Sequence, residues 1–186
     1  MANNSSNVSF GKPKVTGGFY YAPAGTPVPT DATTALNNKF VSVGYISEDG
    51  LVNTVSTDKE EVKAWGGDVV ATAQTSFSDT FAINLLETDV NALKLYFGDG
   101  NVTADAGGKL TIEMNSAELP EVVGVAEIAM TGRRIKRIVI PHAKISDRSG
   151  DITYTDGDAI SYPVNITALP DASGNTHVEY IAKPTP

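Results

Sequence analysis

The sequence predicts a mainly β protein, an antiparallel β-sandwich or barrel with one flanking α-helix. Apolar residues recur with a period of two in several short stretches, and Gly, Pro, Asn and Asp separate these stretches. Only one stretch, 88–97, changes to a helical period. The 186 residues include no cysteine and suffice for one domain with its own core. We therefore expect a single domain over residues 1–186, because repeated short strands are typical of sandwiches and barrels.

The first part of the chain, residues 1–35, differs from the rest and is expected to form an extended N-terminal arm. It has no acidic residue before Asp31, and its prolines disfavour helix and interrupt a sheet ladder. A disordered arm is the alternative. Three consecutive aromatic residues, Phe19, Tyr20 and Tyr21, are costly to leave in water. We therefore expect the arm to pack on its own domain or on a neighbour.

The β core is expected over residues 36–186, and it begins with a strand at 40–46. Residues 47–67 have no clear period, are acidic and contain the only tryptophan, Trp65. A loop of this length in a compact domain is usually functional or disordered. We expect it to be mobile in a free subunit and ordered against a partner. Two further strands, 69–75 and 77–87, are expected to form a hairpin that leads into the helix.

The helix predicted at 88–97 places Val90, Leu93 and Phe97 at i, i+3 and i+7, on one face. Thr88 can act as the N-cap, and Gly98 follows the last apolar residue. Such a short helix is unstable alone in water. These three side chains should therefore dock it against the sheet.

Later strands are predicted from alternation and turn residues at 110–114, 122–130, 133–140, 160–168 and 178–180. The stretch 160–168 has the most regular alternation. Pro163 lies on the face of this stretch opposite to the alternating apolar residues, and it indicates an edge strand or a bulge.

No pattern of residues indicates catalysis, a cofactor or a metal. The two histidines have no i, i+4 partner, and HExxH and GxSxG motifs are absent. Residues 107–110 depart from a phosphate loop, and the oxygen side chains at 99–105 lack the central glycine and closing Glu of a calcium loop. Both are interpreted as surface turns. We expect a protein that is not an enzyme.

Net charge and hydropathy disfavour other classes of protein. The chain has 14 basic and 22 acidic residues, a net charge of −8, which disfavours a general DNA-binding domain. No apolar run approaches the ~20 residues of a membrane span. The start of the chain is polar and unlike a signal peptide, so synthesis in a cytoplasm is expected.

Several segments in combination resemble the major tail tube proteins of phages with long, flexible, non-contractile tails. The segments are Ala22–Ala32, Val43–Leu51, Leu95–Gly98, Ile138–Ile145 and Asp156–Tyr162. The resemblance implies a fold shared with the inner tubes of contractile tails and type VI secretion. It also implies hexameric rings that stack into a hollow tube, through which DNA passes at ejection without specific binding.

The resemblance implies a virion protein, made in the host bacterial cytoplasm, whose main partner is itself. Tape measure, tail terminator and distal tail proteins are the other implied partners. The alternative is a capsid decoration or ligand-binding sandwich, and a hydrolase on a β scaffold is a weaker third option. We expect an acidic lumen. Eight residues are expected at subunit contacts: Phe19, Tyr20, Tyr21, Trp65, Arg133, Arg134, Lys136 and Arg137.

Overall fold

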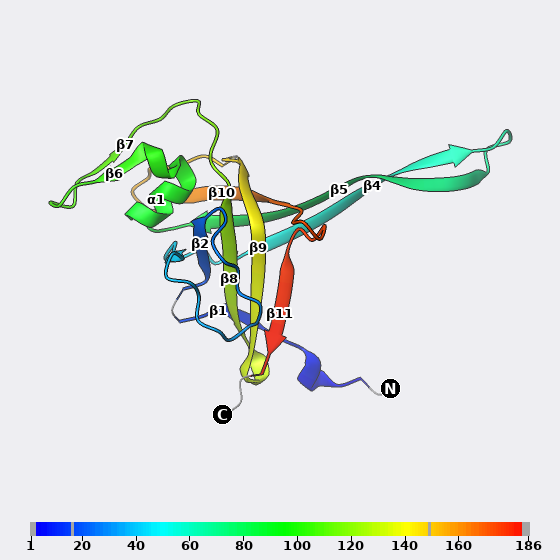
Figure 1. Ribbon diagram of the computed structural model, residues 1–186, viewed down its shortest axis with the longest axis horizontal. Coiled ribbons are helices and arrows are strands. Elements are labelled where there is room, and N and C mark those ends of the chain that lie inside the picture. The colour runs from blue at the N-terminus through cyan, green and yellow to red at the C-terminus, as the bar shows by residue number, and fades with distance from the viewer. Residues whose placement is uncertain (1–2, 16, 149, 184–186) are drawn as a thin grey trace.

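The computed structural model describes residues 3–15, 17–148 and 150–183 and shows a mainly β, antiparallel fold (Figure 1). Within those ranges α1 (Val90–Phe97) is the only α-helix, so the predicted fold class is confirmed. The first two residues of the polar N-terminal stretch lie outside the described residues. The strands are β1 (Gly11–Pro13), β2 (Phe19–Pro23), β3 (Val41–Ser42), β4 (Val52–Lys63), β5 (Val69–Leu85), β6 (Val102–Ala104), β7 (Leu110–Ile112), β8 (Val122–Met130), β9 (Arg134–Asp147), β10 (Tyr162–Leu169) and β11 (Val178–Ala182). Short 3₁₀ helices cover Ser5–Asn7, Asp99–Asn101 and Thr131–Arg133.

One antiparallel sheet forms the body, with strand order β3-β2-β8-β9-β10-β5-β4. β8 and β9 stand at its centre, β1 and β2 both pair with β8, and β10 and β11 both pair with β9. β6 and β7 form a separate two-stranded sheet beside α1 (Figure 1). Figure 1 also shows β4 and β5 crossing the body and running on together far beyond it.

The core takes one face of β10 and of the inner half of β5, as the alternation in the sequence predicts. Residues 162–169 of β10 are alternately buried and half-buried, and the inner half of β5 buries Phe81, Ile83 and Leu85. Pro163 pairs with Asn84 of β5 but precedes the first residue of β10 that pairs with β9. Proline has no N–H to donate, and here no hydrogen bond to β9 is lost because Pro163 lies before the paired part of the strand.

Helix α1 closes one end of the core. Asp89, not the predicted Thr88, is the N-cap: its carboxylate accepts from the Ala92 N–H at 2.8 Å. The Thr88 hydroxyl instead lies 3.1 Å from the Tyr162 hydroxyl. Leu93 and Phe97 are buried in the core, and the half-buried Val90 packs against it. The helix therefore depends on the sheet rather than on its own length.

Two stretches that are predicted as irregular are strands. Residues 19–23 belong to the sheet as β2, where Phe19 is 1% exposed, Tyr21 is buried and Tyr20 is half-buried. The Tyr21 hydroxyl donates to the Asn91 carbonyl at 3.0 Å, and burial, followed by Asp99 and Asp89, raises its pKa to about 12. The N-terminal segment therefore packs on its own domain, one of the two outcomes expected for it, because Phe19 and Tyr21 belong to this subunit's own core.

The predicted loop 47–67 is also wrong over most of its length. Residues 52–63 form β4, which pairs with β5 along its whole length. Residues 69–85 form one continuous strand rather than a hairpin of two. Two register shifts, opposite Asp58/Lys59 and opposite Val62/Lys63, each leave one extra residue on β5, and such bulges mask a period of two in that strand.

Candidate assembly surfaces

The most exposed feature of the chain is a long β-hairpin, here called the arm: residues 52–78, with its tip at 64–68. Every residue of β4 and the first ten residues of β5 are exposed. A two-stranded ribbon without a covered face is only marginally stable in water. The arm nevertheless carries seven exposed large hydrophobic residues: Val52, Val55, Val62, Trp65, Val69, Val70 and Phe77. It is therefore a surface that a partner would cover.

The tip of the arm presents Trp65 on a tight turn. The Ala64 N–H donates to the Asp68 carbonyl at 2.8 Å, and the Gly67 N–H donates to the Ala64 carbonyl at 3.0 Å. Gly66 and Gly67 have φ values of 119° and 97°, which favour glycine. The indole of Trp65 is wholly exposed. A buried aromatic side chain removes about 150–250 Å² of surface from water. Burial of Trp65 in a pocket of a partner would therefore contribute strongly to binding.

The root of the arm is held by the buried carboxylate of Asp79. It accepts hydrogen bonds from the Asn53 amide at 2.7 Å, the Thr176 hydroxyl at 2.6 Å and His177 Nδ1 at 2.6 Å. Burial by itself would raise the pKa of Asp79, but these hydrogen bonds outweigh it and hold the pKa below its ordinary value. The His177 ring also packs edge-on against Phe81 at 5.2 Å. The network joins β4, β5 and the segment before β11, so the arm leaves the body from a fixed point.

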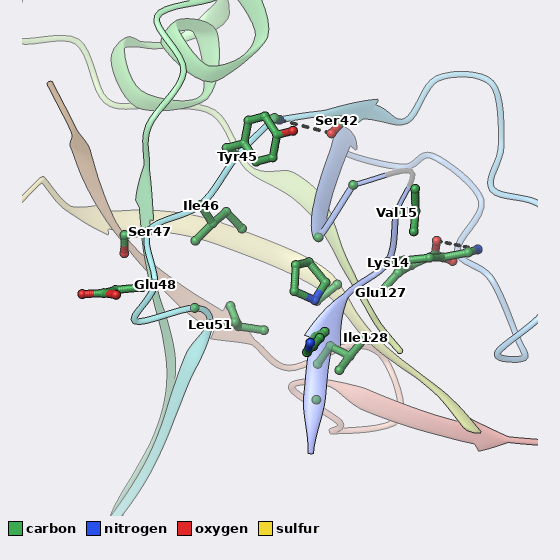
Figure 2. A pocket seen from close by; sticks show the side chains of 18 of the residues that line it. Lys14, Val15, Ser42, Tyr45, Ile46, Ser47, Glu48, Leu51, Glu127 and Ile128 are labelled. Carbon is green, nitrogen blue, oxygen red and sulfur yellow. Dashed lines mark hydrogen bonds and ion pairs between the residues drawn. The ribbon is translucent and has the colours of Figure 1, made fainter. Parts of the chain in front are cut away.

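A groove of about 720 Å³ opens on the body between β1, β8 and the turn at 44–51. Its walls include four aliphatic residues, Pro13, Ile46, Leu51 and Ile128. Figure 2 shows Ile46 and Leu51 on the chain that forms the turn, with Ile128 across from them beside β1. In Figure 2 the exposed Glu48 lies on the outer side of the turn. Lys12 of β1 also lines the groove.

Arg137 of β9 is 1% exposed and forms an internal ion pair with Glu127, which also lines the groove. Its guanidinium also donates to the carbonyls of Asp31, at 2.8 Å, and Thr34, at 2.9 Å. Lys14 reaches the other Glu127 oxygen at 2.9 Å. Burial would raise the pKa of Glu127, but hydrogen bonds from Arg137 and Lys14 outweigh it and lower that pKa. Arg137 therefore fastens the segment 31–34 to the sheet and is not at the surface, contrary to the expected subunit contact.

The other basic residues of the run gather at the end of the body where β8 turns into β9. Arg133 is exposed in the turn and has a φ of 59°. Arg134 donates to the Ser9 hydroxyl, and Lys136 pairs with Glu179 of β11 at 2.7 Å. With Phe19 and Tyr21 buried, the residues expected at contacts that are mainly free for a partner are Trp65 and Arg133.

Sequence patterns miss the groove and the root of the arm. The walls of the groove come from several segments far apart in the chain, and the partners of Asp79 come from two segments. One signal is available for the arm: residues 52–63 are rich in Val and Thr, which favour strands even where no period is visible.

Within the described parts of the chain, no group of three or more acidic or histidine side chains is arranged to hold a metal ion. No helix in those parts is long and apolar enough to cross a membrane.

The whole chain, residues 1–186, matches the family described as Phage tail tube protein. No curated protein matches it. The family is a structural one that is not known as enzymatic, and it implies self-assembly into a tube as part of a virion. The mainly antiparallel β fold, with one α-helix among the described residues, agrees with this match. The chain belongs to the phage tail tube protein family.

Proposed function

We propose that the chain assembles as hexameric rings, and that these rings stack into the tube through which DNA passes at ejection. The arm is the observation that carries this proposal. Its ten exposed β5 residues extend about 33 Å at about 3.3 Å per residue, far enough to reach another subunit. Both faces of the ribbon are exposed in the single chain, so its stability depends on a neighbour.

Ring formation needs two different surfaces that fit each other, since a closed cyclic contact above a dimer is head-to-tail. Free strand edges can supply such surfaces. Among the described strands, β4 pairs only with β5, and β11 pairs only with β9, so each keeps one open edge. β4 stands at one end of the sheet order and β11 lies off that order beside β9, so the two edges are different surfaces, as a head-to-tail contact requires.

The surface charge suits a conduit that does not hold DNA. Each phosphate neutralised by a cation releases counterions and tightens binding. The net charge is −8, Arg137 is buried, and Lys14 and Lys136 are paired with acids. We place the remaining exposed cation of the β8–β9 turn, Arg133, at subunit contacts and the acidic surface towards the lumen. Tape measure, tail terminator and distal tail proteins are the further partners, after synthesis in the host cytoplasm.

Electron microscopy of the purified protein tests the proposal. The wild type is expected to form tubes or six-fold rings. A variant in which residues 57–77 are replaced by Asn-Gly keeps the Ser56–Ser78 pair as the end of a short hairpin. It should retain the far-ultraviolet spectrum and thermal unfolding of the body but form no tubes. Tubes from this variant would show that the arm is not required, and a wild type that never forms rings or tubes would contradict the proposed function itself.

A further inference from the structure

We propose that the groove on the body receives the tip of the arm from a second copy of the chain, with Trp65 as the anchor. This inference rests on the proposed function, because it names the two surfaces that join in the assembly. The tip and the groove cannot meet within one chain: Figure 1 shows the arm running away from β1, β2 and β8, beside which the groove lies. A second copy is therefore the occupant that this chain itself supplies.

The size and lining of the groove fit the tip. At about 720 Å³ it lies in the range of sites that enclose a small ligand, about 300–1,000 Å³. An indole followed by two glycines is compact, and the glycines let the backbone approach the walls closely. Pro13, Leu51 and Ile128 offer the apolar surface that the exposed Trp65 lacks in its own subunit. The contact would thus cover an exposed apolar residue and an apolar recess together.

The charges at the two surfaces are complementary in one orientation. Lys63 ends β4 just before the tip, and Asp68 is the last residue of the tip before β5. The groove has Glu48 and Asp49 on its turn and Lys12 on β1. Lys63 is 3.8 Å from Glu61 in an exposed pair, so little holds it in its own subunit. Docking that places Lys63 near Glu48 and Asp68 near Lys12 pairs opposite charges, while the reversed orientation opposes like charges.

The contact also has the right symmetry. A tip on one copy and a groove on the next form a head-to-tail contact, which leaves one tip and one groove open for further copies. Repeating this contact adds further subunits, so assembly does not stop at a dimer. Several such contacts act at once when rings meet, so each one can be weak and the assembly still stable.

Cross-linking tests the contact directly, because the chain has no cysteine of its own. Ala64→Cys lies beside Trp65 on the exposed tip, and Ser47→Cys lies in the groove turn. The double variant, assembled into tubes and oxidised, is expected to give a ladder of covalent oligomers. A mixture of the two single variants should give dimers only. The matched control pairs Ala64→Cys with Ser173→Cys, in an exposed turn away from the groove, and should stay monomeric.

A second measurement uses Trp65 as the only tryptophan. Its emission should shift to shorter wavelength and its quenching by acrylamide should fall on assembly. Lys63→Glu should raise the concentration needed for assembly at least about tenfold, and Glu48→Lys in the same chain should restore much of the loss. If tubes form without the 64–47 cross-link, and acrylamide quenches Trp65 as strongly as in the free subunit, then the groove does not receive the tip. The proposed function would remain intact. A wild type without any assembly would overturn both.

Discussion

Replacing Arg137 by Met tests whether this residue serves the inside of the subunit or its contacts. The guanidinium is buried against Glu127 and donates to the carbonyls of Asp31 and Thr34. Methionine keeps much of the length and removes the charge. The change therefore leaves the Glu127 carboxylate buried with the half-exposed Lys14 as its remaining ionic partner, and it releases the 31–34 segment.

Removing one partner of a buried ion pair costs about 3–5 kcal/mol. The lower end applies here, because Lys14 still compensates Glu127, and the freed carbonyls of 31–34 can turn to water. A loss of about 3 kcal/mol corresponds to a fall of about 1–2 M in the urea midpoint. Adding Glu127→Gln should recover most of the stability, since no unpaired charge then stays buried.

Urea unfolding of the unassembled subunit, followed by circular dichroism, measures this loss. The fluorescence of Trp65 is unsuitable, because that residue lies on the exposed arm and does not report on the core. Arg134→Met on the same strand is the matched control, and its free energy of unfolding should stay within about 1 kcal/mol of wild type. If Arg137→Met unfolds at the wild-type midpoint but forms no tubes, then Arg137 acts between subunits and the reasoning is wrong.

Three more outcomes follow from the core, the root of the arm and the arm itself. Leu93→Ala should lower the free energy of unfolding of the free subunit by about 2–5 kcal/mol, and unchanged thermal unfolding would remove α1 from the core. The lowered pKa of Asp79 stabilises the fold above the unfolded pKa of about 3.9, and this contribution disappears as pH falls through the folded pKa. Urea midpoints from pH 7 to pH 3 should therefore fall more steeply for wild type than for Asp79→Asn, and parallel curves would refute this role. Protease should cleave the arm in free subunits and spare it in tubes, so equal cleavage in both would count against burial of the arm on assembly.

Strands covered on one face could be predicted, because a strand with one buried face has apolar residues at every second position. β10 is the example, with Tyr162, Val164, Ile166 and Ala168 buried in turn. The helix followed from its own period, although its start shifted by one residue when Thr88 paired with Tyr162.

Strands covered on both faces were located from the sequence, as β8 and β9 show, but the burial of both of their faces was not predicted. Residues 137–140 of β9 are all buried, so Arg137 does not follow the alternation that puts charged side chains in solvent. The second cover comes from the segment 31–34, more than a hundred positions away in the chain. Nothing local marks Arg137 as buried, and only Glu127 on the neighbouring strand explains how its charge is tolerated.

The arm presents the opposite case, a strand pair with neither face covered in its own subunit. Its register shows where the missing cover belongs. Phe77 and Val55 continue the face that carries Asp79 and Phe81 in the body, because residues two apart on a strand share a face and Val55 is opposite Asp79. The other face near the root bears small polar residues, such as the Ser56–Ser78 pair. A neighbouring subunit should therefore pack along the face that extends the core. A stretch that is rich in β-branched residues but shows no period of two thus indicates a strand that is buried only when subunits assemble.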